Sequence, residues 1–325
     1  MKLAIVGATG VVGTKMIEMV EQYEIPFDEL VLFSSKRSSG KKLTVKGETY
    51  IVQELTEEKT ADGFDYVIMS AGGSTSEKFA PLFEQSGAIV IDNSSFWRMH
   101  EDIDLIVPEI NAPLFKRNII ANPNCSTIQS VIALQPLYDT FGIKRVHYAT
   151  YQSVSGSGAG GIRDLEEGAK GAEPTTYPKP IYNNVIPQID VFLDDGYTKE
   201  EVKMIDETKK ILGDDSLQVT ATCVRVPVIS SHSVQINVTL AQPACEEEVR
   251  DAFRNIPHIV LMDNPAEGVY PTPYEATDEN EIYVGRIRKD PTLENTFHVW
   301  CVGDNILKGA AQNTVQILKS LIDHK

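Results

Sequence analysis

The first twenty residues constrain the fold more than any other stretch of the chain. Residues 2–6 form a short apolar run typical of a buried strand, and residues 7–13, Gly-Ala-Thr-Gly-Val-Val-Gly, follow it. Apolar Met16, Ile17 and Val20 then repeat with helical spacing. Glycines at such a turn let the backbone approach a pyrophosphate at a helix N-terminus. This order predicts a dinucleotide-binding domain, although GxxGxxG is a variant of the commoner GxGxxG spacing.

The second predicted strand, residues 30–33, ends in a segment rich in hydroxyls and cations. NAD-binding folds usually carry an acid here for the ribose hydroxyl, but residues 34–40 read Ser-Ser-Lys-Arg-Ser-Ser-Gly, and Asp28 and Glu29 precede the strand. Cations and hydroxyls suit a ribose 2′-phosphate, so we expect NADP rather than NAD. The alternative is a solvated basic loop. The candidate cofactor-binding residues here are Gly7, Thr9, Gly10, Val11, Val12, Ser35, Arg37 and Ser38.

Further strands and a helix alternate through the first third of the chain, as in a doubly wound α/β domain. The strands are expected at residues 50–52, 66–69, 88–91, 105–107 and 118–121, and the helix at 76–85. Arg98 follows one of these strands and so lies at the carboxyl edge of the sheet. An arginine there is either a surface charge or an anion clamp, and we favour the clamp.

Residues 122–127, Asn-Pro-Asn-Cys-Ser-Thr, place a thiol where a strand gives way to a helix. Unpaired backbone N–H groups and the helix dipole favour the thiolate at such a position. Asn124 and Ser126 can cap the helix or donate hydrogen bonds. A small buried cysteine is the commoner situation, but these flanks favour Cys125 as a nucleophile.

Longer, alternating strands after this helix predict a second domain. The strand at 146–154 carries Gln152, and the glycine-rich residues 155–161 after it are expected to be flexible and to close over a nicotinamide. This makes Ser155 and Gly156 further cofactor candidates. The loop at 173–187 is either an interface arm or an excursion.

A capping box at 198–201 begins a helix that Gly213 ends, and within it Glu207 and Lys210 share one face. Such a pair is ordinarily a surface ion pair. The strand at 218–226 carries Arg225, and His232 is in phase with the strand at 233–240, so Pro227 and the Ser230-Ser231 turn must break the chain between them.

The final segment, from Asp304, is expected to be a helix with one apolar face that returns to the first domain and brings Asn305 near the nicotinamide. We therefore assign residues 1–126 and 305–325 to an NADP-binding domain. Residues 127–304 are assigned to an α+β catalytic and dimerisation domain.

Charge and composition exclude several kinds of partner. The formal net charge of −16 argues against nucleic acid or an anionic membrane. The N-terminal apolar run is too short for a signal peptide, so we expect a cytoplasmic protein. The four cysteines show no CxxC pair, which implies neither disulfides nor structural zinc, and Cys223 and Cys301 are expected in the core.

Taken together, the motifs resemble those of the aspartate-β-semialdehyde dehydrogenase family over essentially the whole chain. They occur in that family's order and are GATGVVG, SSKRS, NPNCST, YQSVSGSGAGG, ETKKIL, CVRVPVISSHS and GDNILKGAA. Several separate motifs are more specific than any one of them. The resemblance implies NADPH-dependent reduction of aspartyl phosphate to aspartate semialdehyde and inorganic phosphate, in the biosynthesis of lysine, threonine, methionine and diaminopimelate.

The resemblance also implies roles for individual residues. Cys125 would form an acyl-enzyme thioester, Gln152 would orient the substrate, and His232 would be the acid/base with a pKa near its ordinary value of about 6.5. Arg225 would hold the substrate carboxylate and Glu207 its amino group. The remaining substrate-binding residues are Arg98, Asn124 and Lys210, of which Arg98 and Lys210 would hold the phosphate.

Two alternatives stay open from the sequence. An N-acetyl-γ-glutamyl-phosphate reductase shares the fold and the chemistry, but its substrate has no free amine. A catalytically silent NADP-binding regulatory protein would have no need of both Cys125 and His232. A homodimer, or a tetramer, is the expected assembly.

Overall fold

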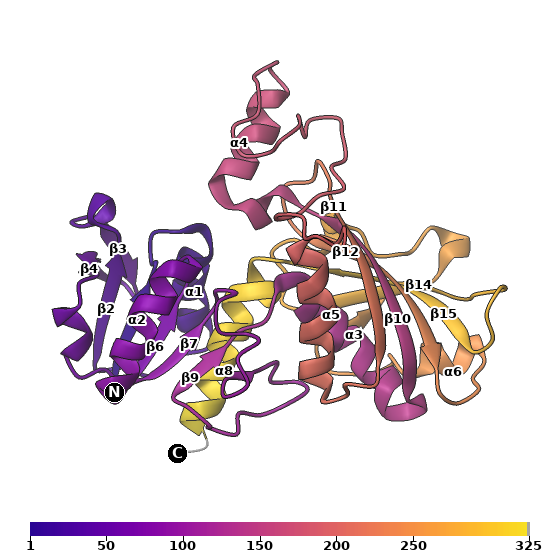
Figure 1. Ribbon diagram of the computed structural model, residues 1–325, viewed down its shortest axis with the longest axis horizontal. Helices are drawn as coiled ribbons and strands as arrows, with labels where there is room; N and C mark the ends of the chain where they lie inside the picture. Colours follow the sequence, from indigo (N-terminus) through magenta and orange to yellow (C-terminus); the bar gives the residue numbers. More distant parts are fainter. Residues whose placement is uncertain (324–325) are drawn as a thin grey trace. The chain divides into compact units, whose positions relative to one another are not determined.

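The computed structural model describes residues 1–323, which divide into two compact units (Figure 1). The first unit contains Met1–Pro123 and the C-terminal segment from Ala310, and the second contains Asn124–Gly309. The expected division, after residue 126 and before residue 305, lies close to these bounds. The assignment of cofactor binding to one domain and catalysis to the other stays a prediction.

A seven-stranded parallel sheet forms the first unit, in the order β5-β2-β1-β6-β7-β9-β8. Its strands are β1 (Lys2–Val6), β2 (Glu29–Ser34), β5 (Gln53–Glu54), β6 (Tyr66–Met69), β7 (Ile89–Asp92), β8 (Asp104–Leu105) and β9 (Ile119–Ala121). The helical elements are α1 (Val11–Gln22), η1 (Lys36–Ser38), η2 (Glu58–Ala61), α2 (Gly73–Gln85) and α8 (Gln312–Asp323). The predicted doubly wound α/β fold is confirmed.

The strands of this sheet are continuous apolar runs because helices cover both of its faces. All four residues of β6 are buried, as are Leu3 to Val6 of β1. The expected strand at 50–52 does not join this sheet. It falls mostly in β4 (Glu48–Ile51), which forms a separate hairpin with β3 (Lys42–Val45).

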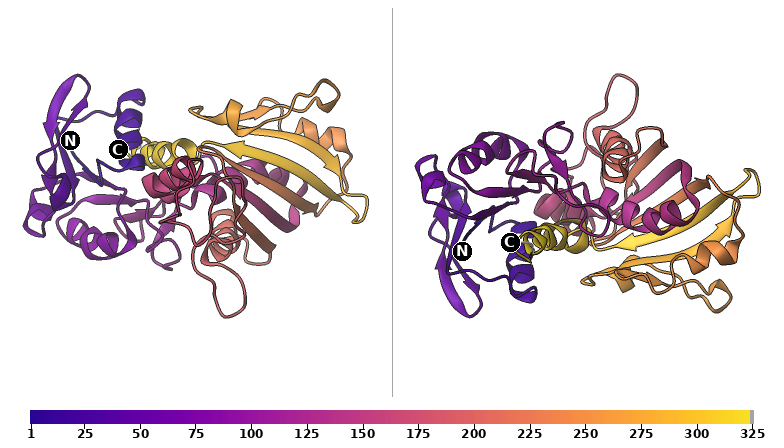
Figure 2. Two further views of the ribbon diagram at one scale, coloured as in Figure 1. Left: turned by 90° about the horizontal axis from the view of Figure 1, so that it is seen from above. Right: turned by 90° about the horizontal axis from the view of Figure 1, so that it is seen from below.

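The C-terminal helix α8 returns to the first unit, as predicted. It packs against α1, β6 and β7, and both views in Figure 2 show this yellow helix beside the indigo N-terminal elements. Asn313 on α8 donates its amide to Asn122 Oδ1 at 2.7 Å and to the Ile106 carbonyl at 3.0 Å. The helix begins later than expected, because a π-helical turn, η5 (Leu307–Ala311), precedes it.

A six-stranded mixed sheet forms the second unit, in the order β11-β10-β12-β15-β14-β13. Its strands are β10 (Ile143–Gln152), β11 (Gln218–Arg225), β12 (His232–Leu240), β13 (Ile259–Leu261), β14 (Ile282–Lys289) and β15 (Thr296–Gly303). The helical elements are α3 (Cys125–Phe141), η3 (Val154–Ser157), α4 (Gly158–Gly168), α5 (Lys199–Leu212), α6 (Glu246–Asp251), η4 (Pro265–Glu267) and α7 (Pro273–Ala276). The predicted α+β architecture is confirmed, and Cys223 and Cys301 are buried in it.

The glycine-rich residues 155–161, expected to be flexible, are helical in the structure. They complete the 3₁₀ turn η3 and begin the helix α4, and Val154 and Ser155 are buried. Glycine here serves close packing, because a Cβ at Gly161 would lie 2.4 Å from the Val154 carbonyl oxygen. Composition indicated mobility, but neighbouring chain fixes the segment.

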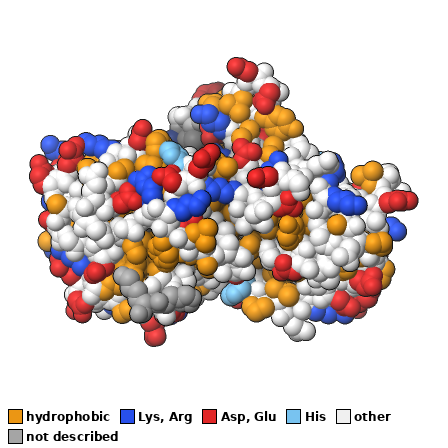
Figure 3. All heavy atoms as spheres, turned by 60° about the horizontal axis from the view of Figure 1, so that its bottom comes forward, with side chains coloured by type: hydrophobic (Ala, Val, Ile, Leu, Met, Phe, Trp, Pro, Cys, Tyr) orange, Lys and Arg blue, Asp and Glu red, His pale blue; other side chains and the backbone are white. Residues whose placement is uncertain are grey.

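Acidic and basic side chains intermingle on the face of the molecule in Figure 3, in keeping with an acidic chain that lacks long runs of one sign. Among residues 1–323, none of the helices combines the length and the hydropathy that a membrane span requires.

Candidate functional site

The turn between β1 and α1 is shaped for close backbone approach. Gly7 has a φ of +84°, and a Cβ there would lie 2.1 Å from the Ser70 carbonyl oxygen. A Cβ at Gly13 would lie 2.1 Å from the Gly7 carbonyl oxygen. Both positions therefore require glycine. Gly7 contacts the residue that follows β6 and Gly13 contacts the turn itself, so the glycines serve packing as well as ligand approach.

The N-terminus of α1 follows this turn directly, with Gly10 as its N-cap and no side chain capping it. The backbone N–H groups of its first turn, which includes Val11 and Val12, are available to an anion. Thr9 Oγ1 lies 2.8 Å from Ser34 Oγ at the end of β2. The residues present thus fit the pyrophosphate of a dinucleotide.

The segment after β2 turns into the short 3₁₀ helix η1. Ser35 is its N-cap, Ser38 is buried, and the Arg37 side chain is exposed. β2 ends at Ser34, and residues 34–40 contain no carboxylate, although Glu54 on the neighbouring strand β5 pairs with Ser34. This donor set fits a ribose 2′-phosphate and lacks the acid that would bind a ribose diol.

Arg98, also in the first unit, is a buried cation whose direction is fixed by backbone carbonyls. Its Nε donates to the Asn122 carbonyl at 2.9 Å, and its Nη2 donates to the Asn93 carbonyl at 3.0 Å. Arg98 as a whole is 7% exposed. This rigid placement supports the expected anion clamp.

In the second unit, Cys125 is the first residue of α3, and Asn124 caps that helix. The Asn124 Oδ1 accepts from the backbone N–H groups of Ser126 at 3.0 Å and Thr127 at 3.2 Å. Cys125 itself is partly exposed. A Cβ at Gly309 would lie 2.9 Å from Cys125 Cβ, so the π-helical turn η5 packs its backbone directly against Cys125.

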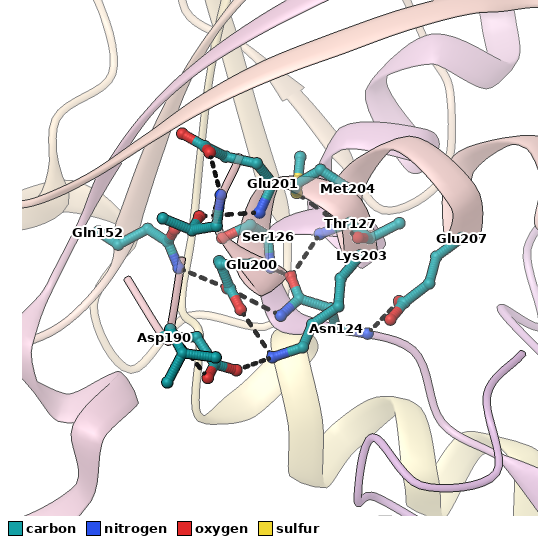
Figure 4. Close-up of polar contacts among 12 residues, drawn as sticks. Asn124, Ser126, Thr127, Gln152, Asp190, Glu200, Glu201, Lys203, Met204 and Glu207 are labelled. Carbon is teal, nitrogen blue, oxygen red and sulfur yellow. Dashed lines mark hydrogen bonds and ion pairs between the residues drawn. The ribbon is translucent and has the colours of Figure 1, made fainter. Parts of the chain in front are cut away.

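Glu200 on α5 lies at the centre of a buried polar cluster (Figure 4). Its Oε1 accepts from Asn124 Nδ2 at 2.9 Å and from Gln152 Nε2 at 3.0 Å, while Lys203 Nζ lies 3.1 Å from its Oε2. Burial alone would raise the pKa of Glu200, but Lys203, Gln152 and Asn124 together lower it to about 2. Glu200 is therefore an ionised carboxylate joined to the residue beside the thiol.

Glu207 lies two helical turns further along α5 and makes a different contact. Its Oε2 accepts from the backbone N–H of Asn124 at 2.6 Å, and its side chain is buried (Figure 4). Lys210, one turn on, is partly exposed. The geometry thus brings Glu200, rather than Glu207, to the side chains of Gln152 and Asn124, while Glu207 braces the backbone that precedes Cys125.

His232 is fully buried at the start of β12, and its Nδ1 accepts a hydrogen bond from the backbone N–H of Ser153 at 3.1 Å. A backbone N–H can only donate, so the neutral ring carries its proton on Nε2. Nε2 has no partner among the described residues. Burial first, and Arg225 second, lower the pKa of His232 to about 3, well below the expected value. The resting imidazole is therefore neutral.

Arg225 ends β11 and lies close to His232, as the predicted break between the two strands requires. The Arg225 Nη1 donates to the Ser153 carbonyl at 2.7 Å. A Cβ at Gly156 would lie 3.0 Å from Arg225 Nη1 and 3.4 Å from His232 Nε2, so both polar groups face the same glycine. Ser231, at φ +69°, turns the chain between the two strands.

Asn305 is buried, and its side chain joins three segments of the second unit. Its Oδ1 accepts from Ser153 Oγ and from the Ser231 N–H, both at 3.0 Å, and its Nδ2 donates to Ser155 Oγ at 3.0 Å. Ser155 is consequently buried as well. These contacts give both residues a structural role in this unit, in addition to the cofactor contact expected of them.

Two residues at this cluster, Glu200 and Lys203, were not identified from the sequence. They repeat the spacing of Glu207 and Lys210 seven residues earlier on the same helix, and Glu200 lies within the capping box, whose acids are normally explained by the helix dipole. Glu200 and Glu207 are both buried, so what distinguishes Glu200 is its hydrogen bonds with Asn124 and Gln152, which one sequence does not reveal.

Comparisons with known proteins extend along the whole chain. Residues 2–117 match a family model described as the semialdehyde dehydrogenase NAD binding domain, and residues 134–308 match the semialdehyde dehydrogenase dimerisation domain. Aspartate-semialdehyde dehydrogenase from Aquifex aeolicus is 48% identical over 99% of this chain and 98% of the relative. The Bacillus subtilis enzyme is 46% identical over 98% of this chain and 96% of the relative.

Solved structures agree with this relationship. Aspartate semialdehyde dehydrogenase II of Vibrio cholerae complexed with ASA has a TM-score of 0.95 at 43% identity, covering 99% of this chain and 98% of that one. The Candida albicans enzyme with NADP has a TM-score of 0.77 at 26% identity, covering 98% and 97%. The chain therefore belongs to the aspartate-semialdehyde dehydrogenase family.

Proposed function

We propose that this chain is an NADPH-dependent aspartate-semialdehyde dehydrogenase, which reduces L-4-aspartyl phosphate to L-aspartate 4-semialdehyde and inorganic phosphate. One observation carries the proposal beyond family membership. Asn124, which caps the Cys125 helix, donates a hydrogen bond to the ionised carboxylate of Glu200. Gln152 donates a second hydrogen bond to the same carboxylate. This hydrogen-bonded set next to Cys125 supports the proposal of an amino acid substrate here.

Cys125 is the nucleophile. Its place at the first position of α3 favours the thiolate, which attacks the acyl carbon and expels phosphate. The resulting thioester accepts a hydride more readily than a carboxylate does. NADPH supplies that hydride, and collapse of the hemithioacetal oxyanion re-forms the thiolate and releases the aldehyde. The proton consumed overall leaves on the phosphate.

His232 acts on the oxygen of the tetrahedral species. In its resting form the neutral ring presents the Nε2 proton, which can donate a hydrogen bond to a developing oxyanion, as neutral histidines do in other enzymes. Full proton transfer requires the ring to gain a second proton first. That second proton would have to bind Nδ1, which accepts from the Ser153 N–H, so the expected acid/base role requires this hydrogen bond to break.

Charge complementarity selects the substrate. Glu200 offers a carboxylate for the substrate ammonium, and Arg225 offers a planar fork for its α-carboxylate. Arg98 and Lys210 hold the phosphate. We assign the ammonium to Glu200 rather than to Glu207 because the Glu200 carboxylate meets the side chains of Gln152 and Asn124, whereas Glu207 meets the Asn124 backbone.

The nearest rival, an N-acetyl-γ-glutamyl-phosphate reductase, is less well supported. An acetylated amine carries no charge, so it would gain no charge pairing from the ionised carboxylate that we propose as the partner of the ammonium. A catalytically silent protein has no use for a capped, partly exposed thiol beside that anion.

Cofactor choice and assembly complete the proposal. Gly7, Gly10 and the first turn of α1 would hold the pyrophosphate, and Arg37 with its neighbouring serines the 2′-phosphate. The second unit matches a dimerisation domain, so we infer a homodimer. We also infer a cytoplasmic enzyme in the biosynthesis of lysine, threonine, methionine and diaminopimelate.

The test is nicotinamide absorbance with aspartate semialdehyde, NADP and phosphate, with each component omitted in turn. Reduction of NADP that requires all three components is expected. Activity that persists without phosphate, or a preference for the N-acetylated aldehyde, would contradict the proposal.

A further inference from the structure

The segment Glu173–Pro187, here called the strap, has no role in the proposed chemistry, although it is firmly attached. Asp164 on α4 is its anchor. The Asp164 carboxylate accepts from the backbone N–H groups of Thr175, Thr176 and Tyr177 at 2.6–3.1 Å and from Thr175 Oγ1 at 3.0 Å. Burial would raise the pKa of Asp164, but these donors lower it to about 2. An ionised carboxylate therefore binds residues 175–177 of the strap to α4, and this set of hydrogen bonds is here called the clasp.

The packing beneath the strap is equally specific. A Cβ at Gly160 would lie 2.6 Å from Thr176 Oγ1, and one at Gly161 would lie 2.5 Å from the Tyr177 hydroxyl. Only glycines allow the strap to lie this close to α4. An apolar cluster lies under the strap and comprises Val154, Ile181 and Ile186, with Ile162, Leu165 and Tyr177 packed against them. In Figure 1 the strap and α4 form one lobe of the second unit.

The strap reaches Arg225 at two points. Ile186 pairs with Arg225 as an isolated antiparallel bridge, with both backbone N–H···O distances at 2.9 Å. Tyr177 then places its ring 5.9 Å from the Arg225 guanidinium carbon, within the range of a cation–π contact. The bridge to Ile186 fixes the backbone of Arg225, and the Tyr177 ring contacts its guanidinium.

The hydroxyl of Tyr177 fixes the position of its ring. Its hydroxyl donates to Ser157 Oγ at 3.0 Å and lies 3.4 Å from the Val154 carbonyl oxygen. On the other side, Arg225 Nη1 donates to the Ser153 carbonyl at 2.7 Å, while Nε has no partner among the described residues. The Arg225 guanidinium thus contacts a carbonyl and an aromatic ring, and its Nε can still donate a hydrogen bond to a ligand.

We infer that the strap is a positioning element that sets the guanidinium of Arg225 for the substrate α-carboxylate, with Tyr177 as its positioning residue and Asp164 as its anchor. This rests on the proposed function of Arg225. A guanidinium that changes orientation keeps its charge but no longer forms two parallel hydrogen bonds to a carboxylate. The strap thereby contributes to substrate selection without touching the substrate.

The experiment compares aspartate semialdehyde with 3-aminopropanal, which keeps the amine and the aldehyde but lacks the carboxylate. Tyr177→Leu should lower the preference for the carboxylated substrate by about tenfold, the scale of a partly desolvated cation–π contact. Tyr177→Phe keeps the ring and should stay within about threefold of the native ratio. Tyr274→Leu changes a tyrosine that is 91% exposed and should change nothing.

The variant Arg225→Ala separates the proposed role of Arg225 from the proposed role of the strap. If it leaves the preference for the carboxylate intact, the proposed role of Arg225 is wrong. If it removes the preference while Tyr177→Leu keeps it, the strap proposal alone is wrong. In the Arg225→Ala background, Tyr177→Leu should have no further effect on the ratio, because its action passes through the guanidinium. An equal loss for both substrates would mean a merely structural role and would overturn the inference.

The variant Asp164→Asn tests the strap proposal independently of Tyr177. An amide cannot accept from three backbone N–H groups as a carboxylate does, so the clasp should loosen and the ratio should move in the same direction as in Tyr177→Leu. Amide hydrogen exchange of residues 173–187 should rise in the same variant. A loosened strap with an unchanged substrate ratio would contradict the proposal.

Discussion

The two candidate sites of this protein are built in opposite ways. The cofactor turn of the first unit is contiguous in sequence, runs from Gly7 to Gly13, and works through backbone and the absence of side chains. The cluster around Cys125 collects side chains from α3, β10, α5 and β12, and most of them are buried. The first site depends mainly on a local conformation, with close contacts from Phe33 and Ser70 of the neighbouring strands, while the second collects its side chains from several elements.

This contrast explains where sequence reasoning succeeded. A glycine turn at the end of a strand predicts its own geometry, because φ and steric limits act on neighbouring residues. Glu200 and Glu207 lie seven residues apart on one helix and are both buried, and only packing decides which side chains each carboxylate meets. The four predictions below test this difference between the sites.

Cys125→Ser should have the largest effect. A hydroxyl without a strong base is poorly ionised at neutral pH, so turnover should fall by about 10³-fold or more, while NADP binding and the melting temperature stay nearly unchanged. Mass spectrometry after mixing native enzyme with an acyl phosphate should locate an acyl group on Cys125. An adduct on another residue, or an active serine variant, would refute the assignment.

Glu200→Gln and Glu207→Gln form a matched pair on one helix. Loss of a charged partner for the ammonium in Glu200→Gln should lower kcat/KM for aspartate semialdehyde by about 10²-fold and reduce discrimination against the N-acetylated aldehyde. Glu207→Gln should keep that discrimination, because its carboxylate braces the Asn124 backbone. The opposite result would return the ammonium to Glu207.

The buried imidazole of His232 predicts a pH dependence of stability. Its pKa is about 3 when folded, against an ordinary value near 6.5, so the unfolded chain takes up a proton first as pH falls. The free energy of unfolding should therefore decrease by about 2 kcal/mol between pH 7 and pH 5 through this group. Chemical denaturation at both pH values should show that excess loss in the native protein relative to His232→Gln. Equal losses would mean that His232 titrates normally.

Arg37→Ala should have the smallest effect, because the side chain is exposed and solvent screens its charge. NADP should bind about tenfold more weakly, the lower end of the range for a hydrogen bond to a charged group, while NAD should be nearly unaffected. Fluorescence titration with both cofactors gives the ratio. Equal weakening of both would mean that this segment does not read the 2′-phosphate.

Much of the fold followed from the sequence alone. Apolar runs gave the strands of the parallel sheet, and the capping box at Thr198 with Gly213 gave both ends of α5 because caps are local hydrogen bonds. The placement of Cys125 at a helix start, with Asn124 as the cap, was also predictable, since both depend on adjacent residues. These features need no partner distant in the chain.

Tertiary structure decided the rest. Only packing could show that Glu200 meets Gln152 across 48 positions of sequence, that the Ser153 N–H fixes the proton of His232 on Nε2, and that a glycine-rich stretch is a rigid helix under the strap. Charge, spacing and composition describe what a residue can do. Burial and long-range hydrogen bonds determine which of those possibilities is realised, because desolvation makes an ionised or hydrogen-bonding group depend on the specific partners that surround it.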